Sequence, residues 1–416
     1  MSYGGQVFRH VLVGSLKDRM GGMTDRITGG WTPAVGEVTG ELDRYFRYTD
    51  TWATNDHGLS TTPAPDQTTL GDFGSTKDLK GKIAGEDADG QHVDWNTAGV
   101  VGWGSGLSPL ALVDDWFATV DALAQSWVDG TPPQVDGTDV SKVFLDDQGR
   151  DYQQLIQKFL LGAVGFSQAA DDYLDDDFPG KGLLSDHTAR VDGKPYTALE
   201  HSWDEAWGYF GAARDYAAYS DDDIKNGVNI DTDNSGGIDI SREMNQGHSV
   251  NAGKRDRLAA ANMDLTADAW TGFTEGRALL AATAGSALTV EQQAELTGYR
   301  DMAIGAWEKA IAATVVHYIN DVLQDMNAAE YVYANHAKHW GELKGFALSL
   351  QFNRTSKVSD ADFGTLQTLI GEGPALPGDA GFDAYKDDLR SARTILGTSY
   401  EFPAEAMGDD DGEGGF

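Results

Sequence analysis

Apolar residues recur every three or four positions along most of this chain, and this spacing predicts amphipathic helices. The pattern runs through residues 6–27, 41–48, 109–127, 151–177, 196–211, 254–262, 266–284, 288–326, 331–352, 360–370 and 379–395. No segment shows the sustained alternation of apolar and polar residues that indicates a β-strand, and no repeat of fixed period is present. The pattern therefore predicts an all-α fold built from helical bundles.

Two regions break the helical pattern. Residues 51–107 are rich in Gly, Asp, Thr and Pro, so we expect a long irregular loop with short helices, one of them over 77–83. Residues 406–416 form an acidic tail that we expect to be disordered. These breaks favour an N-terminal bundle with the loop, residues 1–180, and a C-terminal bundle, residues 181–405. One continuous domain is the alternative.

The net charge of the chain limits the kinds of partner that it can bind. The chain carries 66 Asp and Glu against 31 Lys and Arg, a formal net charge of −35. Such a field repels nucleic acid and anionic membrane surfaces and attracts cations. The same excess is typical of proteins that live in high salt or in water rich in divalent ions. No run of about 18 apolar residues predicts a transmembrane segment.

The chain contains no cysteine, which excludes disulfides, thiolate metal sites and cysteine catalysis. A metal would need His, carboxylate or carbonyl ligands, and these suit iron, zinc, calcium or manganese better than copper(I). The first residues show neither a basic nor an apolar signal region. We expect either a cytosolic protein or an exported one whose signal segment is absent from this chain.

One helix-length stretch, residues 196–211, combines an apolar stripe with polar groups on the neighbouring face. His201 and Asp204 share that polar face with two glycines, and Glu205 follows His201 by four residues. These side chains could bind a metal ion, while the glycines let a ligand or another helix come close. The alternative is tight helix packing around a core histidine that Asp204 or Glu205 holds.

A second stretch, residues 331–352, has the same character. His336 and His339 are about one helical turn apart, as are His339 and Glu342, so two of the three could hold one ion. Helical bundles build metal sites from carboxylates and histidines that project from facing helices. We therefore expect the His201 and His339 helices to face each other across a polar cleft. The order of the residues does not identify the metal.

Residues 231–243 resemble the calcium loop of an EF-hand. The candidate ligands at the first, third, fifth, seventh and ninth positions are Asp231, Asp233, Ser235, the carbonyl of Gly237, and Asp239. The end of the pattern differs, because Arg242 occupies the position of the bidentate glutamate and Glu243 comes one residue late. A calcium site that includes Glu243 and a plain turn rich in Asp and Gly both remain open.

Several stretches together carry a resemblance to a known family: residues 5–9, 79–83, 102–104, 154–164, 200–211 and 339–346. They resemble the family called domain of unknown function 4856, which is related to the imelysins. The resemblance implies an all-α fold and an exported bacterial protein, commonly lipid-anchored. Imelysins carry a Gly-x-His-x-x-Glu motif tied to iron uptake. Here His201 matches the histidine and Asp204 takes the place of the glutamate, whereas no cysteine is present for a lipid anchor.

These observations predict an imelysin-like binding protein of the periplasm or cell surface. Its ligand would be a metal ion or a metal-containing compound, with iron implied by the resemblance, and an outer-membrane or surface protein could be its partner. The alternative is a structural or surface-assembly protein that calcium stabilises. A metallopeptidase is the third hypothesis, since the group has also been labelled a peptidase. Glu205 could then be the base, but His201 and Asp204 alone are too few metal ligands.

Overall fold

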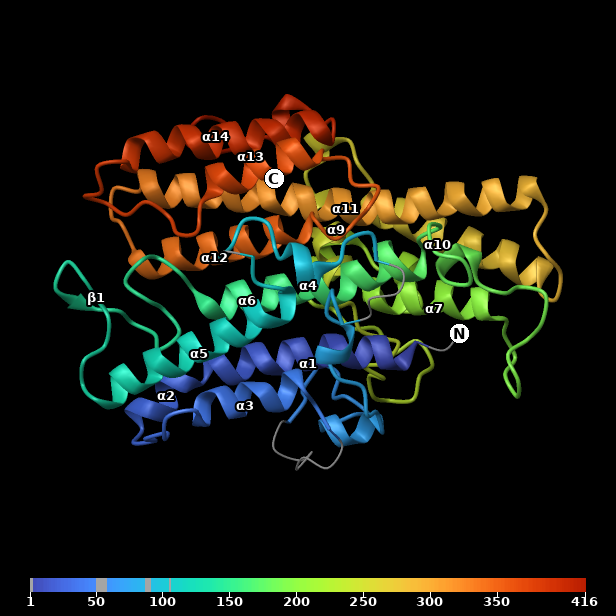
Figure 1. Ribbon diagram of the computed structural model, residues 1–416, viewed down its shortest axis with the longest axis horizontal. Coiled ribbons are helices and arrows are strands. Elements are labelled where there is room, and N and C mark those ends of the chain that lie inside the picture. Colours follow the sequence, from blue (N-terminus) through green and yellow to red (C-terminus); the bar gives the residue numbers. More distant parts are fainter. Residues whose placement is uncertain (1–2, 50–57, 87–90, 105) are drawn as a thin grey trace.

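Helices make up nearly all regular structure in the computed structural model, which describes residues 3–49, 58–86, 91–104 and 106–416 (Figure 1). The longer helices are α1 (Gly4–Gly21), α3 (Glu37–Phe46), α5 (Pro109–Val128), α6 (Tyr152–Leu160), α7 (Ala198–Phe210), α9 (His248–Asp256), α10 (Leu265–Thr283), α11 (Val290–Asn327), α12 (Tyr333–Ser349), α13 (Asp360–Ile370) and α14 (Phe382–Ser399). The shorter ones are α2 (Met23–Thr28), α4 (Trp95–Ala98) and α8 (Asp221–Lys225). Within the described ranges, the strands are a small antiparallel hairpin of β1 (Gln134–Val135) and β2 (Thr138–Asp139). The all-α prediction is confirmed.

Helix starts follow local signals. Pro109 occupies the first turn of α5, and the Ser108 side chain accepts a hydrogen bond from the Ala111 amide. Thr289 begins α11 with a capping box, in which Gln292 reaches back to the Thr289 amide. These residues satisfy amide groups that a helix end leaves without intrahelical partners. Sequence signals therefore place the starts of both helices correctly.

The long helix α11 organises the packing. It runs along the long axis of the molecule, with α13 and α14 above it and α12 and α6 below it, and α1, α2 and α3 lie further down (Figure 1). α11 packs against α10, α12, α9 and α14, while α1 packs against α3, α6 and α7. No helix of the described residues is both long and apolar enough to cross a membrane.

The apolar core is continuous across residue 180. One cluster of buried residues extends from Tyr3 to Phe402. Phe166 lies 5.3 Å from the Trp307 ring, and Phe210 lies 5.1 Å from the same ring, measured between centroids. Side chains from both sides of the predicted boundary therefore share one interior. The division at residue 180 stays a prediction.

The helix predicted over 151–177 has an irregular second half. After α6 the backbone is π-helical over Leu161–Phe166 and again over Ala169–Tyr173. A Cβ atom on Gly162 would lie only 2.0 Å from the Ser349 Oγ of α12. Such π-helical turns are rare and mark places where packing or function overrides the regular ladder. Here the widened turns accompany close contact with α12.

The region predicted as a long loop is irregular in its described parts. It contains single turns at Leu70–Phe73 and Lys80–Lys82, and the short α4. Leu79 and Ile83 are fully buried, which explains how this segment is held on the helices. The expected short helix over 77–83 is thus one 3₁₀ turn. Residues 51–57, 87–90 and 105 of this loop lie outside the described residues.

The tail that we expected to be disordered is ordered and packs on α11. The Gln324 side chain donates a hydrogen bond of 2.7 Å to the Gly412 carbonyl, and the Phe416 ring lies 5.0 Å from the Phe402 ring. A Cβ on Gly412 would lie 2.4 Å from the Asn320 carbonyl oxygen. Acidic composition suggested disorder, but the glycines let the backbone approach the helix closely and Phe416 adds an apolar contact.

Candidate functional site

The polar face of α7 is used for internal contacts. The Arg277 guanidinium of α10 binds Asp204 of this face and the nearby Glu200, with Nε 2.8 Å from Asp204 Oδ1 and Nη1 2.8 Å from Glu200 Oε1. Asp204 is 1% exposed, and its burial raises the carboxyl pKa although Arg277 opposes that shift. An arginine thus occupies the side of Asp204 on which a metal ion was expected.

His201 and Glu205 lie together at the edge of α7. The His201 ring stacks on Tyr196 at 4.6 Å between centroids, and His201 Nε2 lies 3.6 Å from Glu205 Oε1. The same Glu205 oxygen accepts a hydrogen bond from the Gln6 side chain of α1. A Cβ on Gly208 would lie 2.7 Å from Tyr3 Cβ, so this glycine allows close packing of α1. The helix-packing alternative for this face is the one that these contacts favour.

The polar residues of α12 also have internal partners. His336 is completely buried, its Nδ1 lies 2.9 Å from the Tyr331 hydroxyl, and burial lowers its pKa to about 4. His339 Nδ1 lies 2.7 Å from Asp325 Oδ2, and although burial opposes charge on His339, this contact raises its pKa. Glu342 is 3.3 Å from Lys158 Nζ, and this attraction outweighs burial and lowers its pKa.

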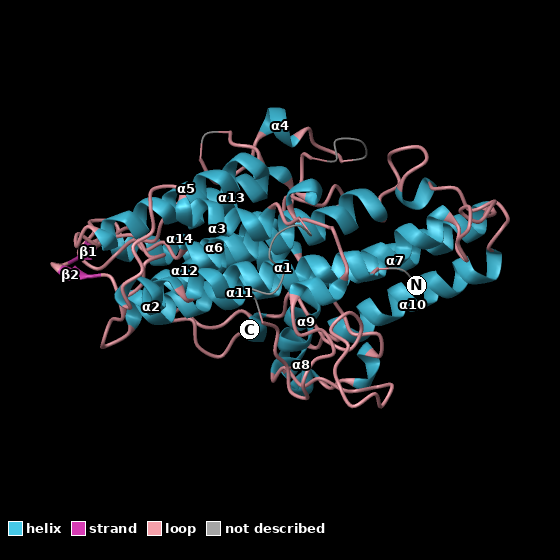
Figure 2. Cartoon of the chain, turned by 90° about the horizontal axis from the view of Figure 1, so that it is seen from below, coloured by secondary structure: helices cyan, strands magenta, loops and turns pink. Residues whose placement is uncertain are grey.

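The structure does not unite the His201 and His339 faces in one site. α7 packs against α1 and α10, whereas α12 packs against α6 and α11. Both views place α7 and α12 toward opposite ends of the molecule (Figures 1 and 2). Among the described residues, neither face gathers three ligand atoms within 4.8 Å of one another. The expected shared cleft is therefore wrong, because helix periodicity gives the face of a residue but not the neighbour of that face.

The EF-hand-like loop does form a cluster. In the part of the chain that the structure describes, the one group of three or more possible ligands within 4.8 Å consists of Asp231, Asp233 and Glu243. The Gly236 amide donates to Asp231 Oδ2 at 2.8 Å, and the Ser235 amide donates to Oδ1 of Asp231 and of Asp233, both at 3.0 Å. Gly236 has a φ of 94°, which suits the sharp turn of such loops. The loop thus folds its first acids around one point.

Glu243 completes the cluster although it stands one residue late in the pattern. Its carboxylate accepts hydrogen bonds from the Thr232 amide at 2.9 Å and the Asp239 amide at 2.9 Å. These bonds hold the side chain, which is 1% exposed, beside Asp231 and Asp233. Arg242, in the position of the usual glutamate, pairs instead with Asp239. The mismatch in the sequence is thus resolved by the fold of the loop.

The remaining predicted calcium ligands are Asp239, Ser235 and the Gly237 carbonyl. Asp239 accepts hydrogen bonds from the Gln67 side chain at 3.0 Å and the Ser241 amide at 2.9 Å, and these bonds outweigh burial and lower its pKa. With Arg242 as a further partner, Asp239 anchors the loop and does not join the acid cluster. The Ser235 hydroxyl donates to the Gly237 carbonyl at 3.3 Å, so both groups lie on the loop beside the cluster.

A segment from the long loop supports the site and was missed by the sequence pattern. The Asp66 amide donates to the Ile238 carbonyl, and the Ile238 amide donates to the Ala64 carbonyl, both at 2.9 Å. A Cβ on Gly237 would lie 2.1 Å from Asp66 Oδ1, so only glycine lets this carboxylate approach. Asp66 is thus a further acid at the rim of the loop. Its distance along the chain hides it from any local motif.

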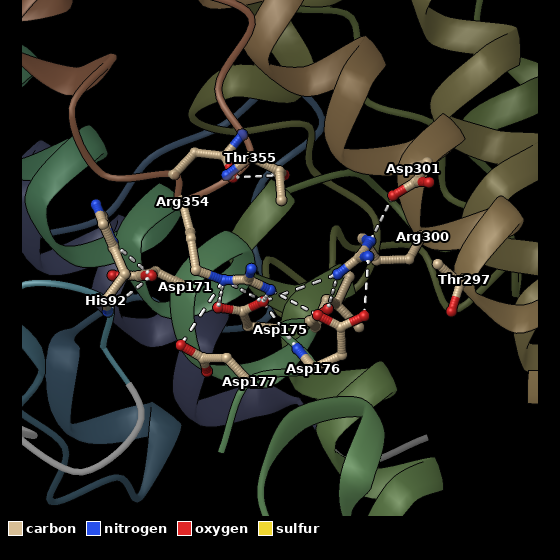
Figure 3. Close-up of polar contacts among 12 residues, drawn as sticks. His92, Asp171, Asp175, Asp176, Asp177, Thr297, Arg300, Asp301, Arg354 and Thr355 are labelled. Carbon is tan, nitrogen blue, oxygen red and sulfur yellow. Dashed lines mark hydrogen bonds and ion pairs between the residues drawn. The ribbon is translucent and has the colours of Figure 1, made fainter. Parts of the chain in front are cut away.

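A second acidic cluster, shown in Figure 3, is bound by two arginines. Asp175 lies 2.9 Å from Arg354 Nε, and Asp176 lies 2.6 Å from Arg354 Nη2 and 3.5 Å from Arg300 Nη2. Nearby, His92 Nδ1 lies 2.7 Å from the buried Asp171, whose pKa burial raises to about 6. These pairs join the π-helical region to α11 and to the segment after α12. Asp175 and Asp176 thus have arginine partners, whereas Asp231, Asp233 and Glu243 have no such partner among the described residues.

Comparison with known families adds one finding. The family model described as domain of unknown function (DUF4856) matches residues 110–370, well over half of the chain. The chain belongs to this family. The part of this DUF4856 protein that matches contains both histidine-bearing helices and the acidic loop, whereas α1, α3 and α14 lie outside it. No curated protein and no solved structure shows a significant match. The relation to imelysins stays a prediction.

Proposed function

We propose that the protein binds one calcium ion at Asp231, Asp233 and Glu243, and that it works as an exported, calcium-stabilised structural or binding module. The observation that carries this proposal is the geometry of three carboxylates within 4.8 Å of one another in an EF-hand-like loop. Oxygen ligands of this kind suit calcium, a hard cation. The Gly237 carbonyl and the Ser235 hydroxyl offer two more oxygens on the same loop.

Electrostatics supports a cation at this point. In the described part of the chain, no Lys, Arg or His forms an ion pair with Asp231, Asp233 or Glu243. Glu243 is buried, and a buried carboxylate is costly unless a positive charge or several hydrogen bonds compensate it. Three amide or hydroxyl donors satisfy part of its demand, but they do not remove the repulsion among the three acids. A bound divalent cation would offset this repulsion.

Calcium at this loop would couple distant segments. The loop is bonded to residues 64–67 through Ile238 and Asp239, and the Arg242 carbonyl accepts a hydrogen bond from the Arg214 amide just after α7. Binding at the acids would therefore fix the end of α7 and part of the long loop together. Loops of extracellular modules bind calcium with dissociation constants of about 10⁻⁴–10⁻³ M, which fits an exported protein.

The contacts of the predicted ligands favour calcium over iron as the bound metal. Each histidine predicted as an iron ligand has a partner within the protein, and neither histidine-bearing helix presents three ligands to one point. The metallopeptidase hypothesis needs at least three protein ligands and a bound water. The His201 face, with Asp204 bound to Arg277, supplies too few.

Calcium titration of the purified protein tests the proposal. After removal of metals with a chelator, we expect one calcium ion per chain by isothermal titration calorimetry and a rise in melting temperature. Saturation to 100 times the dissociation constant corresponds to about 2.7 kcal/mol of stabilisation. Asp231→Asn and Glu243→Gln should each abolish the calcium-dependent rise. Asp192→Asn, an exposed position that changes the charge equally, should retain it.

The outcomes separate the hypotheses. A melting temperature that is the same with calcium and with chelator would refute the calcium proposal, as would an Asp231→Asn variant that responds like the parent. Elemental analysis of the protein as purified from its native host should find no stoichiometric iron. Iron at one atom per chain that disappears in His339→Ala would restore the iron hypothesis instead.

A further inference from the structure

A pocket beside α9 is lined by several basic side chains, although the protein as a whole is strongly acidic. Its volume is about 380 Å³, within the usual range for small-molecule sites. It lies where α8, α9 and α11 meet, beside the last residues of the chain, and Figure 2 shows these elements together. The polar residues that line it are Lys225, Asn251, Lys254, Arg255, Arg257 and His317.

Arg255 is the decisive residue of this pocket. Its side chain is 8% exposed, and its Nε is buried without a hydrogen-bond partner. Among the described residues no carboxylate lies within ion-pair distance of its guanidinium, whereas Arg277, Arg300 and Arg354 each bind at least two acids. A buried arginine without an acceptor is costly, so an acceptor from outside the chain would stabilise the fold.

The surroundings of Arg255 add to the positive charge. Lys225 and Lys254 lie at the exposed rim and, in the described structure, form no ion pair. Arg257 is the exception, because its Nε binds Asp222 Oδ1 at 2.6 Å. Of the acids near the pocket, Glu342 binds Lys158, and Asp321, which lies 3.4 Å from His317 Nε2, attracts Arg255 only from beyond ion-pair distance. The pocket therefore presents unpaired cations to solvent.

We propose that this pocket binds a small organic oxyanion, a phosphate or carboxylate group carried on a compact apolar body, with Arg255 as its anchor. Guanidinium groups bind such oxyanions through two parallel hydrogen bonds. Lys254 and Lys225 add attraction from the rim. Leu258, Tyr318 and Phe416 line the same pocket and provide apolar surface for the rest of the ligand. This site is separate from the calcium loop and goes beyond the proposed function.

Calorimetric titration with simple anions tests the proposal. The probes are inorganic phosphate, phenyl phosphate, benzoate and, as a neutral control, benzyl alcohol. We expect phenyl phosphate or benzoate to bind once per chain, benzyl alcohol not to bind, and the affinity to fall as sodium chloride is added. Arg255→Gln should weaken binding at least tenfold and Lys254→Gln about threefold. Lys142→Gln, which removes an exposed cation elsewhere, should leave the affinity unchanged.

A second measurement separates ligand binding from a structural role of Arg255. Because Arg255→Gln removes a buried charge without a partner, its melting temperature in the absence of anions should equal or exceed that of the parent. A large loss of stability in Arg255→Gln, together with unchanged binding in Lys254→Gln, would show a structural arginine and overturn the proposal. So would the absence of binding by all three anions to the parent. Equal affinity for inorganic and phenyl phosphate would contradict the apolar wall.

Discussion

Arg277 determines what the acidic residues of α7 can do. It brings one cation to Asp204 and Glu200, both nearly inaccessible to solvent, and so converts potential ligands into a structural ion pair between α7 and α10. At Asp231, Asp233 and Glu243 no such cation is present in the described structure, although the residue types are the same. At this scale, the position of the nearest positive side chain separates a structural acid from a candidate ligand.

Removing the Arg277 guanidinium should leave the buried carboxylates of Asp204 and Glu200 without a positive partner and so destabilise the fold. We expect Arg277→Gln to lower the free energy of unfolding by about 3 kcal/mol or more at pH 8, since breaking a buried pair leaves its partners uncompensated. Arg214→Gln, an exposed arginine with the same charge change, should cost well under 1 kcal/mol, as most surface changes do. Chemical denaturation of both variants measures the difference, and equal stabilities would refute the structural role.

The stability lost in Arg277→Gln should also depend on pH, and it should become smaller as the pH falls. Burial raises the pKa of Asp204 in the folded state, and loss of Arg277 raises it further. The folded variant then binds a proton more readily than the unfolded chain, so its stability increases as the pH falls. The difference between Arg277→Gln and the parent should be smaller at pH 5 than at pH 8. A deficit that grows toward acid would contradict this account.

Close contacts at glycine set the packing of the elements. Gly276 of α10 lies against Trp203 of α7, where an added Cβ would be 2.0 Å from the ring atom Cζ2. The Trp203 indole is itself fixed, because its Nε1 donates to the Phe273 carbonyl at 2.8 Å. The rigid ring cannot move without breaking this bond. The two helices can therefore keep their distance only if residue 276 has no side chain.

Two glycine substitutions test this point with opposite expected signs. Gly276→Ala should destabilise the protein by about 1–3 kcal/mol through overpacking, despite the better helix propensity of alanine. Gly298→Ala in α11 meets nothing within 4 Å and lies on an exposed helix face, so it should stabilise by about 0.5–1 kcal/mol. Thermal or urea unfolding compares them. A stabilising Gly276→Ala would show that α7 and α10 are not in close contact.

The charge of the whole molecule is the property that acts on every element at once. A formal net charge of −35 produces repulsion among surface acids, which opposes the compact state. Local clusters offset part of it, as Arg354 and Arg300 do for Asp175 and Asp176 in Figure 3. Over the whole chain, the 66 acidic residues still outnumber the 31 basic residues by about two to one.

Salt should therefore stabilise the protein. Raising sodium chloride from about 0.01 M to 1 M shortens the Debye length from about 30 Å to about 3 Å and screens the repulsion. We expect the melting temperature, measured in the presence of chelator, to rise by several degrees over this range. An uncharged osmolyte of equal osmolarity is the control for general exclusion effects. A melting temperature that falls with salt would mean that attractive ion pairs dominate the balance.

The sequence by itself determined the helical fold, the starts of helices such as α5 and α11, and the residues of the acidic loop, because these depend on neighbours within a few positions. It also carried the family resemblance. Helical periodicity placed His201 and His339 on polar faces, but a face does not specify what lies opposite it. Only the tertiary structure decided that Arg277 and Asp325 occupy those faces, that the glycine-rich tail packs on α11, and that Arg255 lacks a partner, since each depends on residues far apart in the chain.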